Sequence, residues 1–231
     1  MKICGLNKTT LLDYPGKVAA TIFIGGCNFR CPFCHNSSLV TNTASQPEIS
    51  QTEILNFLKK RRGILEGVCV TGGEPTLFPE LADFLSDIRE LGYPIKLDTN
   101  GSNPSFLRFL VQNDLISKVA MDIKSSPQNY SKLTGITTLD FHAIETSVSY
   151  LLEENVDYEF RTTVVRELHN IQDFVEISQW IKGAKAYYLQ AYKDSEEVLQ
   201  PGFSSYSLEE LEHFRTILQK TIPLVEIRGI D

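Results

Sequence analysis

Short apolar segments rich in β-forming residues alternate along this chain with segments in which apolar residues recur at helical spacing. Strands are expected at 18–24, 68–71, 95–98, 119–123, 158–165 and 187–189, and a last apolar run covers 224–227. Helices are expected around 50–63, 81–92, 106–110, 144–152, 174–181 and from 207 onward. Strands and helices that alternate at these lengths are typical of βαβ units built around a parallel sheet.

The number of these units sets the expected fold class. The sequence contains about six units in 231 residues, whereas a closed eight-fold barrel typically takes about 250 residues. We therefore predict an α/β fold, a partial (β/α)6 barrel with parallel strands; an open doubly wound sheet is the alternative. The helices that start near Ser50 and Ser207 are expected to begin with capping boxes. The sequence shows no repeat or linker, so a single domain over residues 1–231 is expected.

Composition narrows the function classes. The 22 Lys and Arg residues against 29 Asp and Glu residues give a net charge of −7. This charge argues against general nucleic-acid binding, because counterion release needs a basic surface. No apolar run reaches the roughly 20 residues that span a bilayer, and the first residues lack the apolar core of a signal peptide. We expect a cytoplasmic protein with no nucleic-acid or membrane partner.

Polar and glycine residues gather at the carboxyl ends of four predicted strands. They form the segments 25–36, 71–75, 98–101 and 122–124. Parallel α/β proteins bind their ligands at this edge of the sheet. The sequence therefore predicts one site that combines all four segments.

Three of the five cysteines form a compact motif, C-x3-C-x2-C, at Cys27, Cys31 and Cys34. They are too close together for useful disulfide loops, and clustered thiols in a chain without a secretion signal indicate a metal or redox site. Tight thiolate loops bind iron–sulfur clusters, and three ligands would leave one iron of a four-iron cluster open. Zinc with His35 as fourth ligand is less favoured, because His35 directly follows Cys34. Structural thiols are the third interpretation.

Four longer motifs make the sequence recognisable. They are Gly-Cys-Asn-Phe-Arg-Cys-Pro-Phe-Cys-His-Asn at 26–36, Thr-Gly-Gly-Glu-Pro-Thr-Leu at 71–77, Leu-Asp-Thr-Asn-Gly at 97–101 and Met-Asp-Ile-Lys at 121–124. Together they resemble the radical S-adenosylmethionine superfamily and, within it, the glycyl-radical-enzyme activases. The sequence is most similar to the activating proteins of anaerobic ribonucleoside-triphosphate reductases. The resemblance covers about residues 3–192 and includes the segment 5–16.

The resemblance implies that Cys27, Cys31 and Cys34 hold a [4Fe–4S] cluster whose open iron binds S-adenosylmethionine. Residues 72–74 would bind the methionine amino group, because glycine allows close approach and a carboxylate complements an ammonium. The complete set of implied cofactor contacts is Phe33, Cys34, His35, Gly72, Gly73, Glu74, Asp98, Thr99, Asp122, Ile123, Lys124, Arg161 and Gln190.

Charged residues in this set would surround the polar parts of the cofactor. By resemblance, Asp98 and Asp122 would lie near the ribose or near a monovalent cation, with Thr99 assisting. Lys124 and Arg161 would face the cofactor's carboxylate.

One position departs from the pattern of some activases. Those proteins carry a histidine after the sixth strand that reaches the cofactor, whereas residues 189–193 contain none. Gln190 or Tyr192 would take its place. By the same resemblance, Phe33 and His35 would pack beside the adenine; for Phe33, simple packing in the core is the alternative.

The resemblance also implies a reaction. A reduced cluster would cleave S-adenosylmethionine to methionine and a 5′-deoxyadenosyl radical, which takes a hydrogen atom from a glycine of a partner glycyl radical enzyme. The first candidate partner is anaerobic ribonucleotide reductase, and a pyruvate formate-lyase-type enzyme is the second.

A flavodoxin or ferredoxin would supply the electron for this reaction. The basic run at 59–62 is either a solvated helix end or a docking patch for such an acidic donor. The rival functions are a radical enzyme that acts on a small molecule or a peptide, and a non-catalytic zinc or redox-sensing module.

Overall fold

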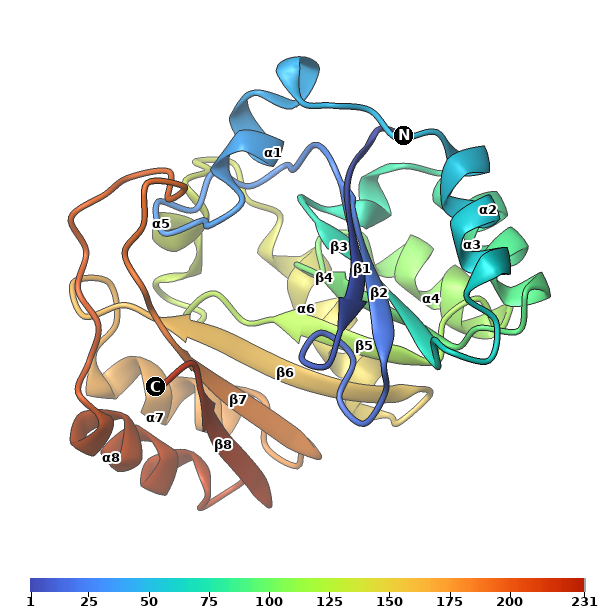
Figure 1. Cartoon of the computed structure of the whole chain (residues 1–231). Coiled ribbons are helices and arrows are strands. Elements are labelled where there is room, and N and C mark those ends of the chain that lie inside the picture. The colour runs from blue at the N-terminus through green and yellow to red at the C-terminus, as the bar shows by residue number, and fades with distance from the viewer. Residues whose placement is uncertain (231) are drawn as a thin grey trace. The chain divides into compact units, whose positions relative to one another are not determined.

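The structure is a computed structural model that describes residues 1–230 (Figure 1). Its strands are β1 (Ile3–Thr10), β2 (Ala19–Ile24), β3 (Gly67–Gly72), β4 (Ile95–Thr99), β5 (Lys118–Asp122), β6 (Asp157–Val164), β7 (Ala186–Ala191) and β8 (Leu224–Arg228). They are hydrogen-bonded in chain order, and β1 and β8 form the edges of the sheet. The pair β1–β2 is antiparallel, whereas β2–β3, β3–β4, β6–β7 and β7–β8 are parallel. The predicted α/β fold with an unclosed parallel sheet is confirmed, and the six predicted strands correspond to β2–β7.

The chain divides into two compact units. The first comprises residues 1–28, 38–99 and 103–119, and the second comprises residues 29–37, 100–102 and 120 onward, so that β5 contributes to both. The helices are α1 (Ser37–Thr41), α2 (Gln51–Lys60), α3 (Leu81–Glu90), α4 (Pro104–Gln112), α5 (Tyr130–Thr134), α6 (Phe141–Leu152), α7 (Ile171–Trp180) and α8 (Leu208–Leu218), with 3-10 turns η1 (Thr43–Ser45) and η2 (Pro75–Leu77). The single domain expected from the sequence stays a prediction.

The core of the first unit combines two buried strands with the apolar faces of three helices. Every residue of β4 is buried, as are residues 67–70 of β3. The helices contribute Ile54, Leu58, Leu81, Phe84, Leu85, Ile88, Leu107 and Leu110. These buried contacts fix the carboxyl ends of β3 and β4, where predicted site residues lie.

Strand β1 was not expected from the sequence. Its residues 7–9 are exposed and polar, so the segment lacks a continuous apolar run. The backbone nevertheless pairs antiparallel with β2, with Leu6 opposite Ile22, and the register shifts twice along the pair. Pairing with an apolar neighbour therefore makes this polar segment an edge strand, which its own residues do not predict.

Helix starts follow the capping rules, with one addition. The Ser50 side chain accepts a hydrogen bond from the Glu53 amide, and Ser207 with Glu210 forms the complete predicted capping box. A second complete box, between Asn170 and Asp173, begins α7. This box was not expected from the sequence, because Asn170 and Asp173 differ in residue type from the Ser-x-x-Glu pattern. No helix within residues 1–230 is both long and apolar enough to cross a membrane.

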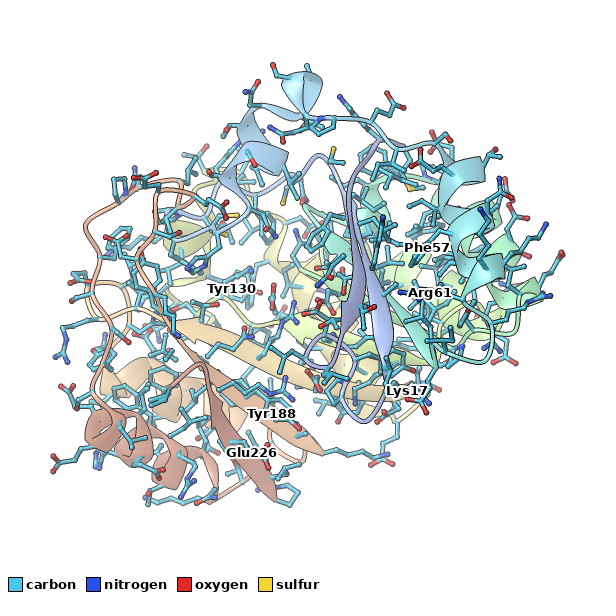
Figure 2. The ribbon with its side chains drawn as sticks, in the orientation of Figure 1. Lys17, Phe57, Arg61, Tyr130, Tyr188 and Glu226 are labelled. Atoms are coloured by element: carbon cyan, nitrogen blue, oxygen red, sulfur yellow. The ribbon has the colours of Figure 1, made fainter. Side chains whose placement is uncertain are left out.

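Strands β6–β8 of the second unit carry a polar row on one face. Tyr188 lies in register with Glu226 on β8 (Figure 2). Tyr188 also lies in register with Arg161 on β6, and Gln190 lies in register with Arg228. Registered neighbours project to the same face of a sheet. The opposite face is apolar and buried, and it contains Phe160, Tyr187, Leu189 and Val225. The polar face therefore presents Arg161 and Gln190, two of the predicted site residues.

Candidate cluster and cofactor site

The carboxyl end of β3 accommodates only glycine. The Gly73 amide donates to the Ile24 carbonyl at 2.8 Å, and the Glu74 amide donates to the Gly26 carbonyl at 2.8 Å. A Cβ atom at Gly73 would lie 2.6 Å from the Gly26 carbonyl carbon and 3.3 Å from the Cys27 Cβ. A Cβ atom at Gly72, where φ is +119°, would lie 2.6 Å from the Ile24 amide nitrogen. Both glycines thus allow the segment that leads into Cys27 to lie directly against β3.

Glu74 is fully buried and ties two strand ends together. Its Oε1 atom accepts hydrogen bonds from the Thr76 amide at 3.1 Å, the Thr76 hydroxyl at 2.5 Å and the Thr99 hydroxyl at 2.7 Å. A buried carboxylate needs such donors to offset the loss of its hydration. Glu74 therefore has a structural role, and its predicted contact with the methionine amino group stays a prediction.

Asp98 has a buried partner that sequence analysis did not single out. The Lys96 ammonium, 2% exposed, forms an ion pair with the Asp98 carboxylate. The Cys69 thiol lies 3.8 Å from Asp98 Oδ1 and 3.9 Å from Lys96 Nζ. Side chains two residues apart on a strand share a face, so this parity was the signal that could have linked Lys96 to Asp98.

Two of the three motif cysteines lie in the second unit. The Cys34 amide donates to the Cys31 carbonyl at 3.1 Å, which makes a tight turn. Cys31 is buried, and burial raises the pKa of its thiol to about 11, although the nearby Lys124 ammonium opposes this shift. Cys27 belongs to the first unit. The structure thus defines the Cys31–Cys34 turn, and the full set of three ligands stays a prediction.

The cysteines of residues 1–230 are all reduced thiols, and no disulfide joins them. Within the same residues, no set of three or more His, Cys, Asp or Glu side chains is gathered as a ready-made metal site. Cys69 is fully buried in β3, as a small apolar side chain would be.

A charged cluster follows β5. The Asp122 carboxylate pairs with Lys124 Nζ at 2.8 Å and with Arg161 Nε at 2.5 Å. Burial alone would raise the pKa of Asp122, but the two cations outweigh it and hold that pKa well below its usual range. Asp122 thus holds together the two cations whose contact with the cofactor's carboxylate is predicted, and that contact stays a prediction.

Replacing Asp122 by asparagine is expected to lower the free energy of unfolding, since both cations lose their shared partner. The carboxylate is 25% exposed, so we expect about 3 kcal/mol, the low end for breaking a buried ion pair. Because its pKa is lowered, Asp122 stabilises the fold above the ordinary carboxyl pKa of about 4, and this contribution is lost as the pH falls toward the lowered pKa.

Urea unfolding of the metal-free protein measures this effect. The matched control is Glu154→Gln, which removes the exposed Lys185–Glu154 pair and should cost less than about 1 kcal/mol. Equal losses in both variants would contradict the role assigned to Asp122.

Ile123 links this cluster to β6 through its backbone. Its amide donates to the Arg161 carbonyl at 2.8 Å, and its carbonyl accepts from the Thr162 hydroxyl at 2.5 Å. The side chain is fully buried. Ile123 therefore fixes the strand end beside Asp122, and its predicted contact with the cofactor stays untested.

The aromatic residues of the cysteine loop have defined neighbours. Phe33 is buried and meets the His169 ring edge-on, with ring centres 6.3 Å apart. His35 Nε2 lies 2.6 Å from the Lys193 carbonyl oxygen, so this nitrogen donates its proton. A nitrogen that donates to a carbonyl cannot ligate a metal. This contact weakens the zinc interpretation with respect to Nε2 of His35.

Neither candidate for the missing histidine is placed at a cofactor by the structure. Gln190 lies near the end of β7, on the polar face of the sheet. Tyr192 is buried; its ring packs against His35 at 5.4 Å and its hydroxyl donates to Asp194 at 2.8 Å. Tyr192 thus supports His35, while a cofactor contact of Gln190 stays a prediction.

Comparison with known proteins places this arrangement in a family. Residues 21–181 match the family described as the Radical SAM superfamily. The chain belongs to the radical SAM superfamily. Membership implies a [4Fe–4S] cluster and S-adenosylmethionine as cofactors, and it confirms the resemblance to the superfamily, whereas the resemblance to activating proteins of anaerobic ribonucleotide reductases stays a prediction.

Two relatives extend this likeness along the chain. The "Putative glycyl-radical enzyme activating enzyme" of Methanocaldococcus jannaschii is 28% identical over 237 residues, which cover 99% of this chain and 96% of the relative. The pyruvate formate-lyase-activating enzyme of Clostridium pasteurianum is 32% identical over 141 residues, 58% of this chain and 57% of that enzyme. This radical SAM protein therefore matches one relative over almost the full length of both chains.

Solved structures agree on the fold. SuiB of Streptococcus suis bound to S-adenosylmethionine has a TM-score of 0.66 at 16% identity, over 90% of this chain and 51% of SuiB. A domain of a pyruvate-formate lyase-activating enzyme from Bacteroides vulgatus has a TM-score of 0.58 at 19% identity, over 71% of this chain and 99% of that domain. At these identities the likeness concerns the fold alone.

The residues of this radical SAM protein fit the implied cofactors. The loop carries reduced thiols, which are the ligands that iron–sulfur clusters use. In the second unit, Lys124 and Arg161 are cations of the kind that would bind a carboxylate. The thiols and these cations are therefore of the chemical types that a cluster and an amino-acid cofactor need.

Proposed function

We propose that this protein is a glycyl-radical-enzyme activase. The observation that carries the proposal is the match to a relative of that printed name over 99% of this chain and 96% of the relative. A second relative, named a pyruvate formate-lyase-activating enzyme, supports the same class. When bound, a reduced [4Fe–4S] cluster and S-adenosylmethionine would supply the radical chemistry, in which one electron cleaves S-adenosylmethionine to methionine and a 5′-deoxyadenosyl radical that would become 5′-deoxyadenosine by taking a hydrogen atom from a partner's glycine.

The residues of this chain hold and orient the reactants in this proposal. Cys27, Cys31 and Cys34 would ligate the cluster. The backbone at 72–74 would receive the methionine amino group. The protein supplies no acid–base step, since the cofactor carries the chemistry and the chain positions it.

Charged and aromatic side chains complete the proposed cofactor site. Lys124 and Arg161 would receive the carboxylate, and Asp98 with Thr99 would approach the ribose. Phe33, His35 and Gln190 would contribute the remaining contacts at the adenosine. A monovalent cation is left out of the proposal, because Asp98 and Asp122 already pair with basic side chains.

The partner and the donor are the finer parts of the proposal. Anaerobic ribonucleotide reductase is our first candidate partner, on the sequence resemblance, and a pyruvate formate-lyase-type enzyme is the second. A flavodoxin or ferredoxin would supply the electron, and the reaction would take place in the cytoplasm. The basic residues at 59–62, at the end of α2, are the candidate contact for an acidic donor.

Hydrogen transfer from a labelled partner tests the function. The reconstituted protein is reduced without oxygen in the presence of S-adenosylmethionine and each candidate partner, deuterated at its glycine Cα. We expect one deuterium in 5′-deoxyadenosine and a glycyl radical signal in electron paramagnetic resonance. A partner whose reactive glycine is replaced by alanine serves as the control.

Two results would contradict the activase proposal. One is 5′-deoxyadenosine that carries no label from either partner, with no glycyl radical signal. The other is turnover that depends on a small molecule or peptide instead of a glycyl radical enzyme.

A further inference from the structure

The cysteine loop, residues 29–37, is covered by a distant segment of the same unit. We call residues 193–206 the strap; it is the orange-to-red loop that connects β7 to α8 in Figure 1. The Leu199 amide donates to the Cys34 carbonyl at 3.1 Å, and the Gln200 amide donates to the Pro32 carbonyl at 2.8 Å. The strap therefore hydrogen-bonds to the backbone on both sides of Phe33.

Side chains extend this contact. His35 Nε2 donates to the Lys193 carbonyl at 2.6 Å, and the His35 ring packs against buried Tyr192 just before the strap. The Ser37 amide reaches the Glu197 carbonyl at 3.4 Å. The loop is thus held from Pro32 to Ser37, the stretch that contains Cys34.

The far half of the strap is itself anchored. The Arg166 amide donates to the Ser204 carbonyl at 3.0 Å, and the Ser204 amide donates to Glu167 Oε2 at 2.9 Å. The Tyr206 hydroxyl donates to the His169 carbonyl at 2.6 Å. Because the strap is fixed at this end, its contacts with the cysteine loop can restrain that loop.

The other end of the loop is held by the end of α5. The Arg30 amide donates to the Thr134 carbonyl at 2.8 Å. Gly135 follows with φ +66°, and a Cβ atom there would lie 2.5 Å from the Arg30 carbonyl oxygen. The approach of Arg30 therefore requires glycine at 135, both for its backbone angle and for space.

We propose that the strap and Gly135 are positioning elements that hold Cys31 and Cys34 ready for the cluster before it binds. The proposal rests on the proposed function of those two cysteines as cluster ligands. Groups that orient metal ligands contribute to metal retention without touching the metal. A loop held at Arg30 and from Pro32 to Ser37 keeps the two thiols between fixed points, so less ordering is needed on assembly.

A glycine pair provides a matched test. Gly135→Ala places its Cβ against the Arg30 carbonyl, whereas Gly183→Ala, at φ +88°, meets nothing within 4 Å. Alanine at a positive φ should lower the free energy of unfolding by a similar amount in both variants, but only Gly135→Ala disturbs the loop. We expect the cluster of Gly135→Ala to be lost to an iron chelator at least about tenfold faster than that of wild type, since outer contacts change metal affinity by about 10–100-fold. Gly183→Ala should retain it like wild type.

Hydrogen exchange of the metal-free protein supplies a readout that does not depend on the cluster. The amides of Arg30, Cys34, Leu199 and Gln200, which donate hydrogen bonds within the loop, to α5 or from the strap, should be protected in wild type and in Gly183→Ala and should exchange faster in Gly135→Ala. Should Gly135→Ala fail to fold, Leu199→Pro removes the donor to Cys34 within the irregular strap. Its control is Glu196→Pro, whose amide makes no hydrogen bond among residues 1–230.

The two readouts separate failure of this inference from failure of the proposed function. Equal cluster retention and equal protection in folded Gly135→Ala, or in Leu199→Pro against its control, would overturn the positioning role. Wild type that assembles no iron–sulfur cluster would instead refute the ligand assignment, and with it the basis of this inference.

Discussion

Cys31→Ala is expected to yield a folded protein that assembles no stable cluster and forms no 5′-deoxyadenosine. The substitution removes one of three proposed thiolate ligands, and the remaining pair cannot hold a four-iron cluster. Removing one buried sulfur atom should lower the free energy of unfolding only slightly, so the variant should fold while losing its function. Iron and acid-labile sulfide per chain, measured after anaerobic reconstitution and desalting, should fall to background.

Cys4→Ala provides the control for this variant. Cys4 is 7% exposed and Cys31 is 6% exposed, so both substitutions remove a thiol of similar burial. Iron, sulfide and product should match wild type in Cys4→Ala. A full cluster in Cys31→Ala, or an equal loss in both variants, would contradict the assignment of Cys31 as a ligand.

Gly73→Ala is expected to have the second-largest effect. The added Cβ would lie 2.6 Å from the Gly26 carbonyl carbon and 3.3 Å from the Cys27 Cβ. Because the nearest atoms belong to the Gly26 backbone, they cannot move aside as a flexible side chain would. The segment that leads into Cys27 must shift from β3, so we expect lower cluster content and a severe loss of 5′-deoxyadenosine formation.

The control is Gly5→Ala, also in the first unit. A Cβ atom there would meet the Phe23 side chain at 3.4 Å, which is ordinary van der Waals contact. Thermal unfolding of both metal-free variants separates loss of fold from displacement of the loop. Normal iron binding and normal product formation in Gly73→Ala would show that the close approach at β3 is not required.

The parts of the fold that the sequence predicts are those with a strong local pattern. Strands β2–β5 are mostly apolar runs followed or ended by glycine or polar residues, and most of their side chains are buried. Strand β1 is different, because its exposed residues 7–9 are polar and it forms through pairing with β2. Long-range pairing of this kind leaves no periodic signal in the sequence.

For the candidate site too, the sequence predicts some features and not others. The motifs predict which residues lie at the carboxyl ends of strands, such as Gly72 at the end of β3 and Asp122 at the end of β5. They do not show that Glu74 binds Thr76 and Thr99, nor that buried Lys96 neutralises Asp98. Those contacts depend on side-chain burial and on the spacing between neighbouring strands.

The contacts of the strap are the feature of the site that the sequence predicts least. Residues 193–206 show no helical or strand period, and their main contacts with the cysteine loop use backbone groups, as at Leu199 and Gln200. Every residue but proline carries the same backbone donor, so the sequence cannot reveal which amides meet Cys34 and Pro32. Only the folded chain shows that this irregular segment restrains the loop.

Formation of 5′-deoxyadenosine by the wild-type protein tests most directly whether this chain cleaves S-adenosylmethionine by means of an iron–sulfur cluster. The protein is purified without oxygen, reconstituted with iron and sulfide, and reduced with dithionite in the presence of S-adenosylmethionine. We expect iron and sulfide in the ratio of a four-iron cluster, together with 5′-deoxyadenosine and methionine. Bound zinc in place of iron, with no 5′-deoxyadenosine, would contradict it.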